Sequence, residues 1–178
     1  MGSWRRGLLM VFTGDGKGKT TAAMGSALRA IGHGMKVLMI QFIKGTWHYG
    51  ELDAARLLGG ALEIRPMGRG FLKPGQSTPD PQHIEAARQA LAAARSAIES
   101  RGYDMVILDE INNAVDYGLL DIAEVLETLR LRPPEMHVIC TGRNAHPRLI
   151  EEADLVSEVR AVKHPFDKGI RAQRGIEY

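Results

Sequence analysis

The feature that most constrains the fold is a glycine-rich loop near the amino terminus, Thr13-Gly14-Asp15-Gly16-Lys17-Gly18-Lys19-Thr20-Thr21. An apolar run at 8–12 precedes the loop and is typical of a buried strand, and an alanine-rich helical pattern at 22–31 follows it. Glycines leave backbone N–H groups free to surround an anion, and the following helix directs the positive end of its dipole at the same place. The order strand, loop, helix therefore predicts a binding site for the phosphates of a nucleoside triphosphate, and it argues against a glycine-rich surface turn.

Two side chains of the loop have specific expected roles. Lys19 is expected to reach the terminal phosphates, and the Thr20 hydroxyl to join a magnesium site. The other expected ATP contacts come from the rest of the loop, namely Gly14, Asp15, Gly16, Lys17, Gly18 and Thr21. Thr13 stands where the general phosphate-loop pattern has its first glycine, and the glycines are more densely spaced than that pattern requires. This departure indicates a particular subfamily.

Apolar runs alternate with helical patterns along the whole chain. Strands are expected at 8–13, 36–43, 62–66, 105–108, 137–141 and 155–162, and helices at 19–32, 50–58, 81–101, 121–131 and 146–153. The strands are continuous Val, Ile and Leu runs, which predicts a parallel sheet covered by helices on both faces. Ligands of such sheets bind at the carboxyl ends of the strands. Two stretches, 44–50 and 66–81, fit neither pattern and are expected to be functional loops.

Size and composition restrict the class of protein. The 178 residues fit a single domain, 1–178, and a formal net charge of +2 gives no support for a nucleic-acid or membrane surface. The apolar run at 8–12 is too short for a membrane span or the core of a signal peptide. The single cysteine, Cys140, lies at the end of an apolar run and is expected to be a buried, inert thiol in a reducing cytoplasm.

An acidic pair and an arginine follow two of the expected strands. Asp109 and Glu110 come directly after the strand at 105–108, where phosphate-loop proteins hold the carboxylate that orients magnesium. The alternative is an acidic pair that faces solvent at the start of a helix. Arg143 follows the strand at 137–141 and could approach phosphate or ribose, although a surface arginine fits the position nearly as well. The six histidines show no metal-ligand spacing, so no zinc site is expected.

Five segments carry a resemblance to a known family. They are VFTGDGKGKTTAA, QFIKGTW, MVILDE, CTGRNAH and AVKHPFDKGIRAQRGIEY. Together they make the chain resemble, over nearly its whole length, the phosphate-loop ATP:corrinoid adenosyltransferases. The last segment is the most specific, because ordinary phosphate-loop ATPases have no counterpart to it. The resemblance implies a three-layer, phosphate-loop NTPase-like (RecA-like) α/β fold and a homodimer.

The resemblance also implies a reaction. A corrinoid in the cobalt(I) state, either cobalamin or its cobyrinic acid diamide precursor, attacks C5′ of ATP and releases intact triphosphate. Cobalt(I) is itself a strong nucleophile, so the protein need only position C5′ and neutralise the leaving group. By position, Lys19, Thr20 and Glu110 are the expected catalytic residues. Thr20 and Glu110 would hold Mg²⁺, for which Mn²⁺ could substitute, and Asp109 is a further candidate ligand.

For the corrinoid, the resemblance implies an apolar, aromatic environment that displaces the lower cobalt ligand and eases reduction of cobalt(II). The expected contacts are Trp47, Phe71, Lys73, His164 and Phe166. Family members often have Gly-Phe-Thr-Trp where this chain has Gly-Phe-Leu-Lys, so that Lys73 occupies the place of the tryptophan. A flavoprotein or another reductant is the implied electron donor.

Two other functions fit the same loop. A phosphate-loop kinase or ATPase would cleave at the γ-phosphate and yield ADP, but no acceptor-binding or lid motif supports it. A corrinoid and ATP carrier or sensor would retain the loop without the transfer chemistry. Lys73, in the place of the family tryptophan, is the residue that keeps this second alternative open.

Overall fold

Six parallel strands form one sheet in the computed structural model, which describes residues 6–45, 48–70 and 80–177. Their order across the sheet is β3-β2-β4-β5-β1-β6. The strands are β1 (Leu9–Thr13), β2 (Val37–Gln41), β3 (Leu62–Pro66), β4 (Met105–Asp109), β5 (His137–Thr141) and β6 (Leu155–Glu158). The helices are α1 (Lys19–Gly32), α2 (Gly50–Leu57), α3 (Pro81–Ser100), α4 (Ile111–Asp116), α5 (Ile122–Arg130) and α6 (Pro147–Glu152), and a 3₁₀ turn, η1, spans Pro165–Lys168.

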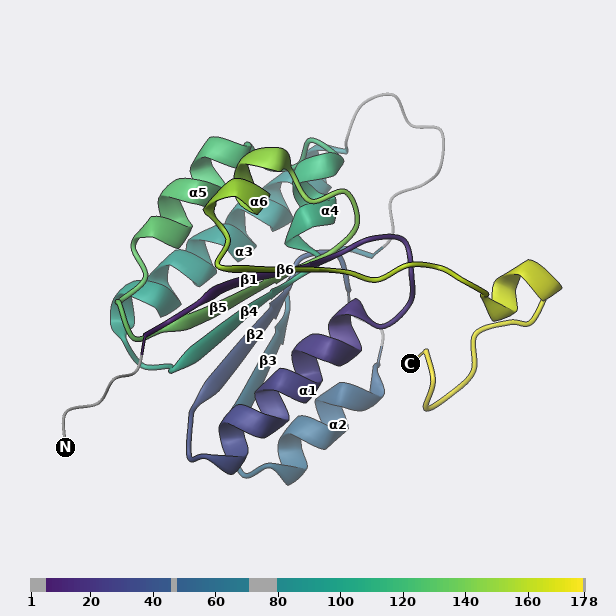
Figure 1. The fold of residues 1–178 in the computed structure, drawn as a ribbon, viewed down its shortest axis with the longest axis horizontal. Helices are drawn as coiled ribbons and strands as arrows, with labels where there is room; N and C mark the ends of the chain where they lie inside the picture. Colours follow the sequence, from purple (N-terminus) through teal and green to yellow (C-terminus); the bar gives the residue numbers. More distant parts are fainter. Residues whose placement is uncertain (1–5, 46–47, 71–79, 178) are drawn as a thin grey trace.

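The sheet has an apolar core on each face. Alternation along a strand sends neighbouring side chains to opposite faces. In β4, Val106 and Leu108 therefore pack with α3, α4, α5 and α6, whereas Met105 and Ile107 pack with α1 and α2. Figure 1 shows these two helical layers on either side of the sheet. The three-layer α/β arrangement expected from the continuous apolar runs is confirmed.

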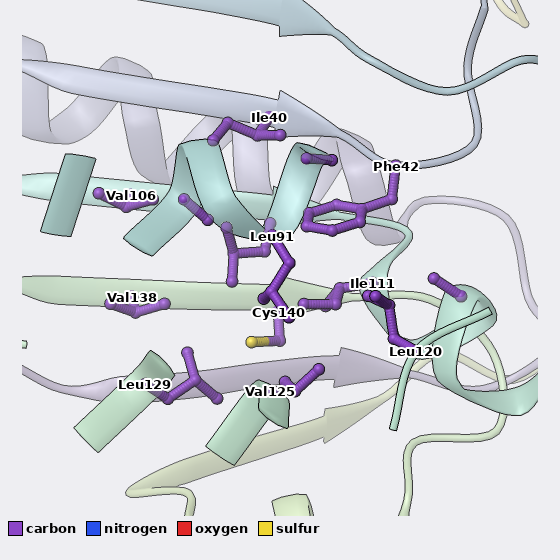
Figure 2. Packing of buried hydrophobic residues seen from close by; sticks show 14 of the residues in the cluster. Ile40, Phe42, Leu91, Val106, Ile111, Leu120, Val125, Leu129, Val138 and Cys140 are labelled. Carbon is purple, nitrogen blue, oxygen red and sulfur yellow. The ribbon is translucent and has the colours of Figure 1, made fainter. Parts of the chain in front are cut away.

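Cys140 lies inside the larger core. Figure 2 shows its thiol among apolar side chains that include Val125 and Leu129. The residue is fully buried, and burial raises the pKa of its thiol to about 12. The prediction of a buried cysteine is confirmed.

A buried thiol with a raised pKa is expected to be chemically silent. A thiol-specific reagent at pH 8 is therefore expected to leave Cys140 unlabelled in the native protein, because the reactive thiolate is absent and the reagent has no access. Full labelling is expected after denaturation. Mass spectrometry before and after addition of urea measures both states, and rapid labelling of the native protein would contradict the prediction.

The bounds of two strands differ from the sequence-based expectation, and one helix was not expected. The second strand, expected at 36–43, spans Val37–Gln41. The last strand, expected to run to 162, ends at Glu158, because its neighbour β1 ends at Thr13, the residue paired with Glu158. The chain then turns to the phosphate loop, where the Val159 carbonyl accepts a hydrogen bond from the Gly16 N–H at 2.7 Å. Helix α4 was not expected, since its six residues include two asparagines and are too few to show a helical period.

Within the described residues, none of the helices combines the length and apolar character that crossing a bilayer requires.

Candidate nucleotide site

The phosphate loop joins β1 to α1 at the carboxyl edge of the sheet. Helix α1 begins at Lys19, and no side chain of the described residues caps its amino terminus. Side chains of Asp80, Asp121 and His146 cap α3, α5 and α6. The first N–H groups of α1 are therefore available to a ligand. An open helix start behind a glycine-rich loop is suited to an anion.

The side chain of Lys19 folds back into the phosphate loop. Its Nζ donates hydrogen bonds to the carbonyl oxygens of Gly14 at 2.6 Å and Gly16 at 2.8 Å. Burial lowers the pKa of Lys19, and the nearby Arg143 guanidinium lowers it further, while Asp15 and Glu110 oppose the shift. The ammonium group is thus held at the centre of the loop.

Gly14 and Gly16 are in close contact with the carboxyl-terminal segment, 159–177, which follows β6. A Cβ added to Gly14, which has φ +95°, would lie 2.5 Å from the Val159 carbonyl oxygen. A Cβ on Gly16 would lie 2.7 Å from the same oxygen and from the carbonyl carbon of Arg160. These two glycines therefore allow the loop to pack against the backbone of the carboxyl-terminal segment.

Three buried polar residues end the neighbouring strands on the α1 side of the sheet. Gln41, Asp109 and Thr141 are the last residues of β2, β4 and β5, and all three are 0% exposed. In each strand, the residue two positions earlier belongs to the core beneath α1 and α2. The period of two along a strand therefore places these polar side chains on the same face, next to the phosphate loop.

Asp109 connects this group to the loop. Its Oδ1 accepts hydrogen bonds from the hydroxyls of Thr20 and Thr141, both at 2.8 Å. Its Oδ2 lies 3.4 Å from Gln41 Nε2 and 3.9 Å from Lys44 Nζ. The solvent-facing acidic pair considered as an alternative is therefore wrong for Asp109, which is buried and bonded on both oxygens.

Glu110 lies beside Asp109 in a left-handed backbone conformation, with φ 63°. Its N–H donates to the hydroxyl of Thr141 at 2.9 Å. Its side-chain Oε2 is buried and has no hydrogen-bond partner among the residues that the structure describes. Burial, and next the charge of Asp109, raise the pKa of Glu110 to about 7. A carboxylate oxygen that is buried without a partner and faces an anion site is suited to a cation.

The pKa of Glu110 predicts a pH-dependent stability. Because this pKa is raised from an ordinary 4.5 to about 7 in the folded protein, the stabilising contribution of Glu110 is present below pH 4.5 and lost as the pH rises through 7. The Glu110→Gln variant has no ionisable carboxyl group at this position, so its stability does not fall as the pH rises through 7 on account of residue 110. In the absence of Mg²⁺ and ATP, we expect the variant to exceed wild type in free energy of unfolding by on the order of 1 kcal/mol at about pH 8, and by much less at about pH 5. Urea unfolding at both pH values measures this, and an equal gain at both would contradict it.

Arg143 lies beside the phosphate loop, near Asp15. Its backbone N–H donates to Asn113 Oδ1 at 3.1 Å, and its guanidinium approaches Asp15, with Nε 4.0 Å from Oδ1. The preceding Gly142 has φ +133°, and a Cβ there would lie 2.4 Å from Asn113 Oδ1. The side chain of Arg143 is 58% exposed but lines the cleft, so it is available to a bound ligand.

A cleft of about 800 Å³ opens over these groups. The phosphate loop forms its floor, and its walls include Lys44, Tyr49, Glu110, Tyr117 and Arg143. The carboxyl-terminal segment contributes His164, Gly175, Ile176 and Glu177, and Glu177 Oε1 lies 3.7 Å from Lys17 Nζ. The chain reaches this position by looping out through η1 and returning (Figure 1).

Two of the five expected corrinoid contacts, His164 and Phe166, lie among the described residues. His164 lines the cleft, and its Nδ1 accepts a hydrogen bond from the Phe166 N–H at 3.2 Å. Phe166 itself is 78% exposed and is not part of the cleft wall. Trp47, Phe71 and Lys73 lie outside the described residues.

Residues 5–178 match the sequence profile of the family ATP:corrinoid adenosyltransferase BtuR/CobO/CobP. The chain belongs to this family. Among relatives of this adenosyltransferase, the corrinoid adenosyltransferase of Escherichia coli strain K12 is 46% identical over 177 residues, which cover 97% of this chain and 86% of the relative.

Two solved structures share the fold of this adenosyltransferase at low sequence identity. The flagellar accessory protein FlaH from Methanocaldococcus jannaschii has a TM-score of 0.58 at 15% identity, over 86% of this chain and 71% of FlaH. The RadB recombinase has a TM-score of 0.55 at 18% identity, over 92% of this chain and 79% of RadB. Both likenesses support the RecA-like α/β fold that was expected.

Sequence reasoning missed several residues that line the adenosyltransferase cleft or support it. They are Gln41, Lys44, Tyr49, Glu51, Asn113, Tyr117, Thr141 and Glu177. Gln41 and Thr141 could have been found, because each is a polar residue that ends an apolar run two positions after a core residue. The others lie in loops, in short helices or in the carboxyl-terminal segment, where no periodic pattern fixes the direction of a side chain.

Proposed function

We propose that this chain transfers the 5′-deoxyadenosyl group of ATP to the cobalt(I) of a corrinoid, cobalamin or cobyrinic acid diamide, and releases triphosphate. Membership of the adenosyltransferase family over residues 5–178 carries the proposal. The geometry of the cleft supports it, because Lys19, Thr20 and Glu110 converge where a triphosphate would lie against the open end of α1.

The proposed reaction is a displacement at carbon. The cobalt(I) electron pair forms the bond to C5′ while the bond from C5′ to the triphosphate oxygen breaks, and the bonding pair leaves with the triphosphate. The protein therefore has to stabilise negative charge on a leaving group. Lys19, the N–H groups of the loop and Arg143 are the proposed donors, and all of them line the cleft. The loop is proposed to hold the triphosphate so that C5′ faces the corrinoid.

Mg²⁺ fits the donors beside the loop. The Thr20 hydroxyl and the unpartnered Oε2 of Glu110 would hold the ion directly, with Asp109 orienting the hydroxyl or joining the ligands. A bound Mg²⁺ would neutralise part of the triphosphate charge. Mn²⁺ is expected to substitute, since it prefers the same oxygen ligands.

We place the corrinoid at the mouth of the cleft, beside His164 of the carboxyl-terminal segment. The expected contacts of Trp47, Phe71, Lys73 and Phe166 stay predictions. A flavoprotein or another external reductant is proposed to supply electrons to the cobalt, as the resemblance to the family implies.

We further propose that the chain is a single cytoplasmic domain that works as a homodimer. One sheet includes strands from Leu9 to Glu158, and the one cysteine is a free thiol, as is usual in a reducing compartment. Val162, Phe166, Ile170 and Ile176 expose apolar side chains on the carboxyl-terminal segment, and such surface is common at subunit contacts. Light scattering after size exclusion measures the mass, and a monomer at all concentrations would refute the dimer.

An anaerobic assay tests the proposed reaction. The protein is mixed with ATP, Mg²⁺ and chemically reduced cobalamin, the loss of cobalt(I) absorbance is followed, and the phosphate product is identified. Light-sensitive adenosylcobalamin with intact triphosphate would support the transferase. ADP with unchanged corrinoid would indicate a kinase or ATPase, and binding of both ligands without turnover would indicate a carrier or sensor.

A further inference from the structure

Lys44 is a buried cation in the cleft to which the proposed transfer assigns no role. It follows β2, its side chain is only 15% exposed, and it lines the cleft. Its Nζ forms a short ion pair with Glu51 Oε1 and lies 3.9 Å from Asp109 Oδ2. The same ammonium group lies 4.7 Å from the centre of the Tyr49 ring. Lys44 is thus enclosed by two carboxylates and an aromatic face.

The two carboxylate oxygens of Asp109 contact different parts of the site. Oδ1 receives the hydroxyl of Thr20, at the start of α1, whereas Oδ2 faces Lys44. The rotation of this carboxylate is therefore fixed from both sides. If the cation facing Oδ2 is lost, Oδ2 keeps only the 3.4 Å contact with Gln41, while Thr141 still bonds Oδ1. The carboxylate is then held less firmly, and the acceptor that orients the Thr20 hydroxyl is less well fixed.

Glu51 connects the same cation to α2. It lies in the first turn of that helix, and its Oε1 accepts a hydrogen bond from Gln41 Nε2 at 3.2 Å in addition to the ion pair with Lys44. Tyr49, which precedes the helix, is 9% exposed and lines the cleft. The contacts of Lys44 therefore tie the start of α2 to the carboxyl end of β4.

The charges of this group depend on one another. Burial acts to lower the pKa of Lys44, but the carboxylates of Asp109 and Glu51 outweigh burial, so that the net shift is upward and the amine stays charged. Burial likewise acts to raise the pKa of Glu51, and the hydrogen bond and charge of Lys44 reverse the shift. A buried carboxylate that loses its partner is strongly destabilising, so removal of Lys44 would disturb both neighbours.

We propose that Lys44 is a positioning residue for adenosyl transfer. Through Asp109 it orients the Thr20 hydroxyl toward the triphosphate, and through Glu51 it holds the start of α2 at the wall of the cleft. It acts through these residues and not on the substrate, because its ammonium group is already occupied by Glu51, Asp109 and the Tyr49 ring. The inference rests on the proposed function, which supplies the reaction that Lys44 supports.

The test compares Lys44→Met and Lys44→Arg with Lys36→Met in the anaerobic transfer assay. Lys36 is a matched control, since it precedes the same strand at the opposite end and its Nζ lies 5.5 Å from another tyrosine ring, that of Tyr103. We expect Lys44→Met to lower kcat by about 10-fold to 100-fold and to raise KM for ATP about 10-fold, with KM for the corrinoid unchanged. Lys36→Met is expected to match wild type.

The two Michaelis constants separate positioning from a general loss of structure. A smaller folded fraction lowers kcat and leaves both constants unchanged, so that result would overturn the proposal. Lys44→Arg keeps the charge and is expected to fold as wild type does, yet its planar group cannot reproduce the contacts of the ammonium, and KM for ATP is again expected to rise. An unchanged KM for ATP in this variant would also overturn the proposal.

A double variant and a binding measurement complete the test. Lys44→Met combined with Glu51→Gln removes both members of the ion pair, so we expect its loss of kcat to be no greater than that of Lys44→Met alone. Multiplied losses would mean that the two residues act independently, against the proposal.

If wild type forms no adenosylated corrinoid, the proposed function fails. The role of Lys44 is then tested by calorimetry, which measures the Kd for ATP in the presence of Mg²⁺. An approximately 10-fold weaker Kd in Lys44→Met, but not in Lys36→Met, supports the positioning role, and equal Kd values overturn it.

Discussion

Lys19→Ala is expected to lower the rate of adenosyl transfer by roughly 10³-fold. Lys19 is the ammonium group at the centre of the phosphate loop, where it now bonds the carbonyl oxygens of Gly14 and Gly16. A bound triphosphate would offer it charged oxygens instead, and negative charge grows on these oxygens as the bond to C5′ breaks. The loss is therefore expected mainly in kcat, since the interaction strengthens in the transition state.

Lys17→Ala is the matched control for that variant. Lys17 belongs to the same loop, but its side chain is 39% exposed and lies 3.7 Å from Glu177, at the edge of the cleft. We expect it to lower the rate by about 10-fold or less, because an exposed charge is screened by solvent. Stopped-flow measurement of cobalt(I) loss under anaerobic conditions gives both rates. Equal rates for the Lys19 and Lys17 variants would contradict the role given to Lys19.

The sequence was sufficient to predict the sheet and the local part of the site. Continuous apolar runs predicted the parallel strands, and the loop with Lys19 and Thr20 was recognised because its residues are adjacent in the chain. Asp109 was placed near Thr20 by the rule that ligands bind at the carboxyl ends of strands, and the 2.8 Å bond between them agrees with that rule. The binding roles of these residues stay predictions.

Contacts between distant segments could not be predicted in this way. The bond from Gly16 to Val159 depends on where the chain turns after β6, and that turn follows from the length of β1, not from any residue pattern near Val159. The enclosure of Lys44 depends equally on how α2 packs against the sheet. A lysine after a strand is usually a solvated residue, and only the contacts with Glu51 and Asp109 distinguish this one.

Gly16→Ala is expected to weaken ATP binding and to destabilise the fold. The new methyl group would lie 2.7 Å from the Val159 carbonyl oxygen and 2.7 Å from the Arg160 carbonyl carbon. Both are backbone atoms, so no change of rotamer relieves the contact, and either the loop or the carboxyl-terminal segment has to move. We expect a loss of about 1–3 kcal/mol in the free energy of unfolding, as for other overpacked sites, together with a raised Kd for ATP.

Gly25→Ala shows whether a methyl group by itself has this effect. Gly25 lies exposed in the middle of α1, and a Cβ there would meet no heavy atom of the described residues within 4 Å beyond its chain neighbours and the backbone of its own helix. Alanine favours the helix, so this variant is expected to gain about 0.5–1 kcal/mol in stability and to bind ATP as wild type does. Urea unfolding and calorimetric titration with ATP measure both variants. Wild-type stability and affinity in Gly16→Ala would contradict the prediction. That result would mean that the loop can move away from the carboxyl-terminal segment, and that the contact with Val159 does not determine the shape of the phosphate site.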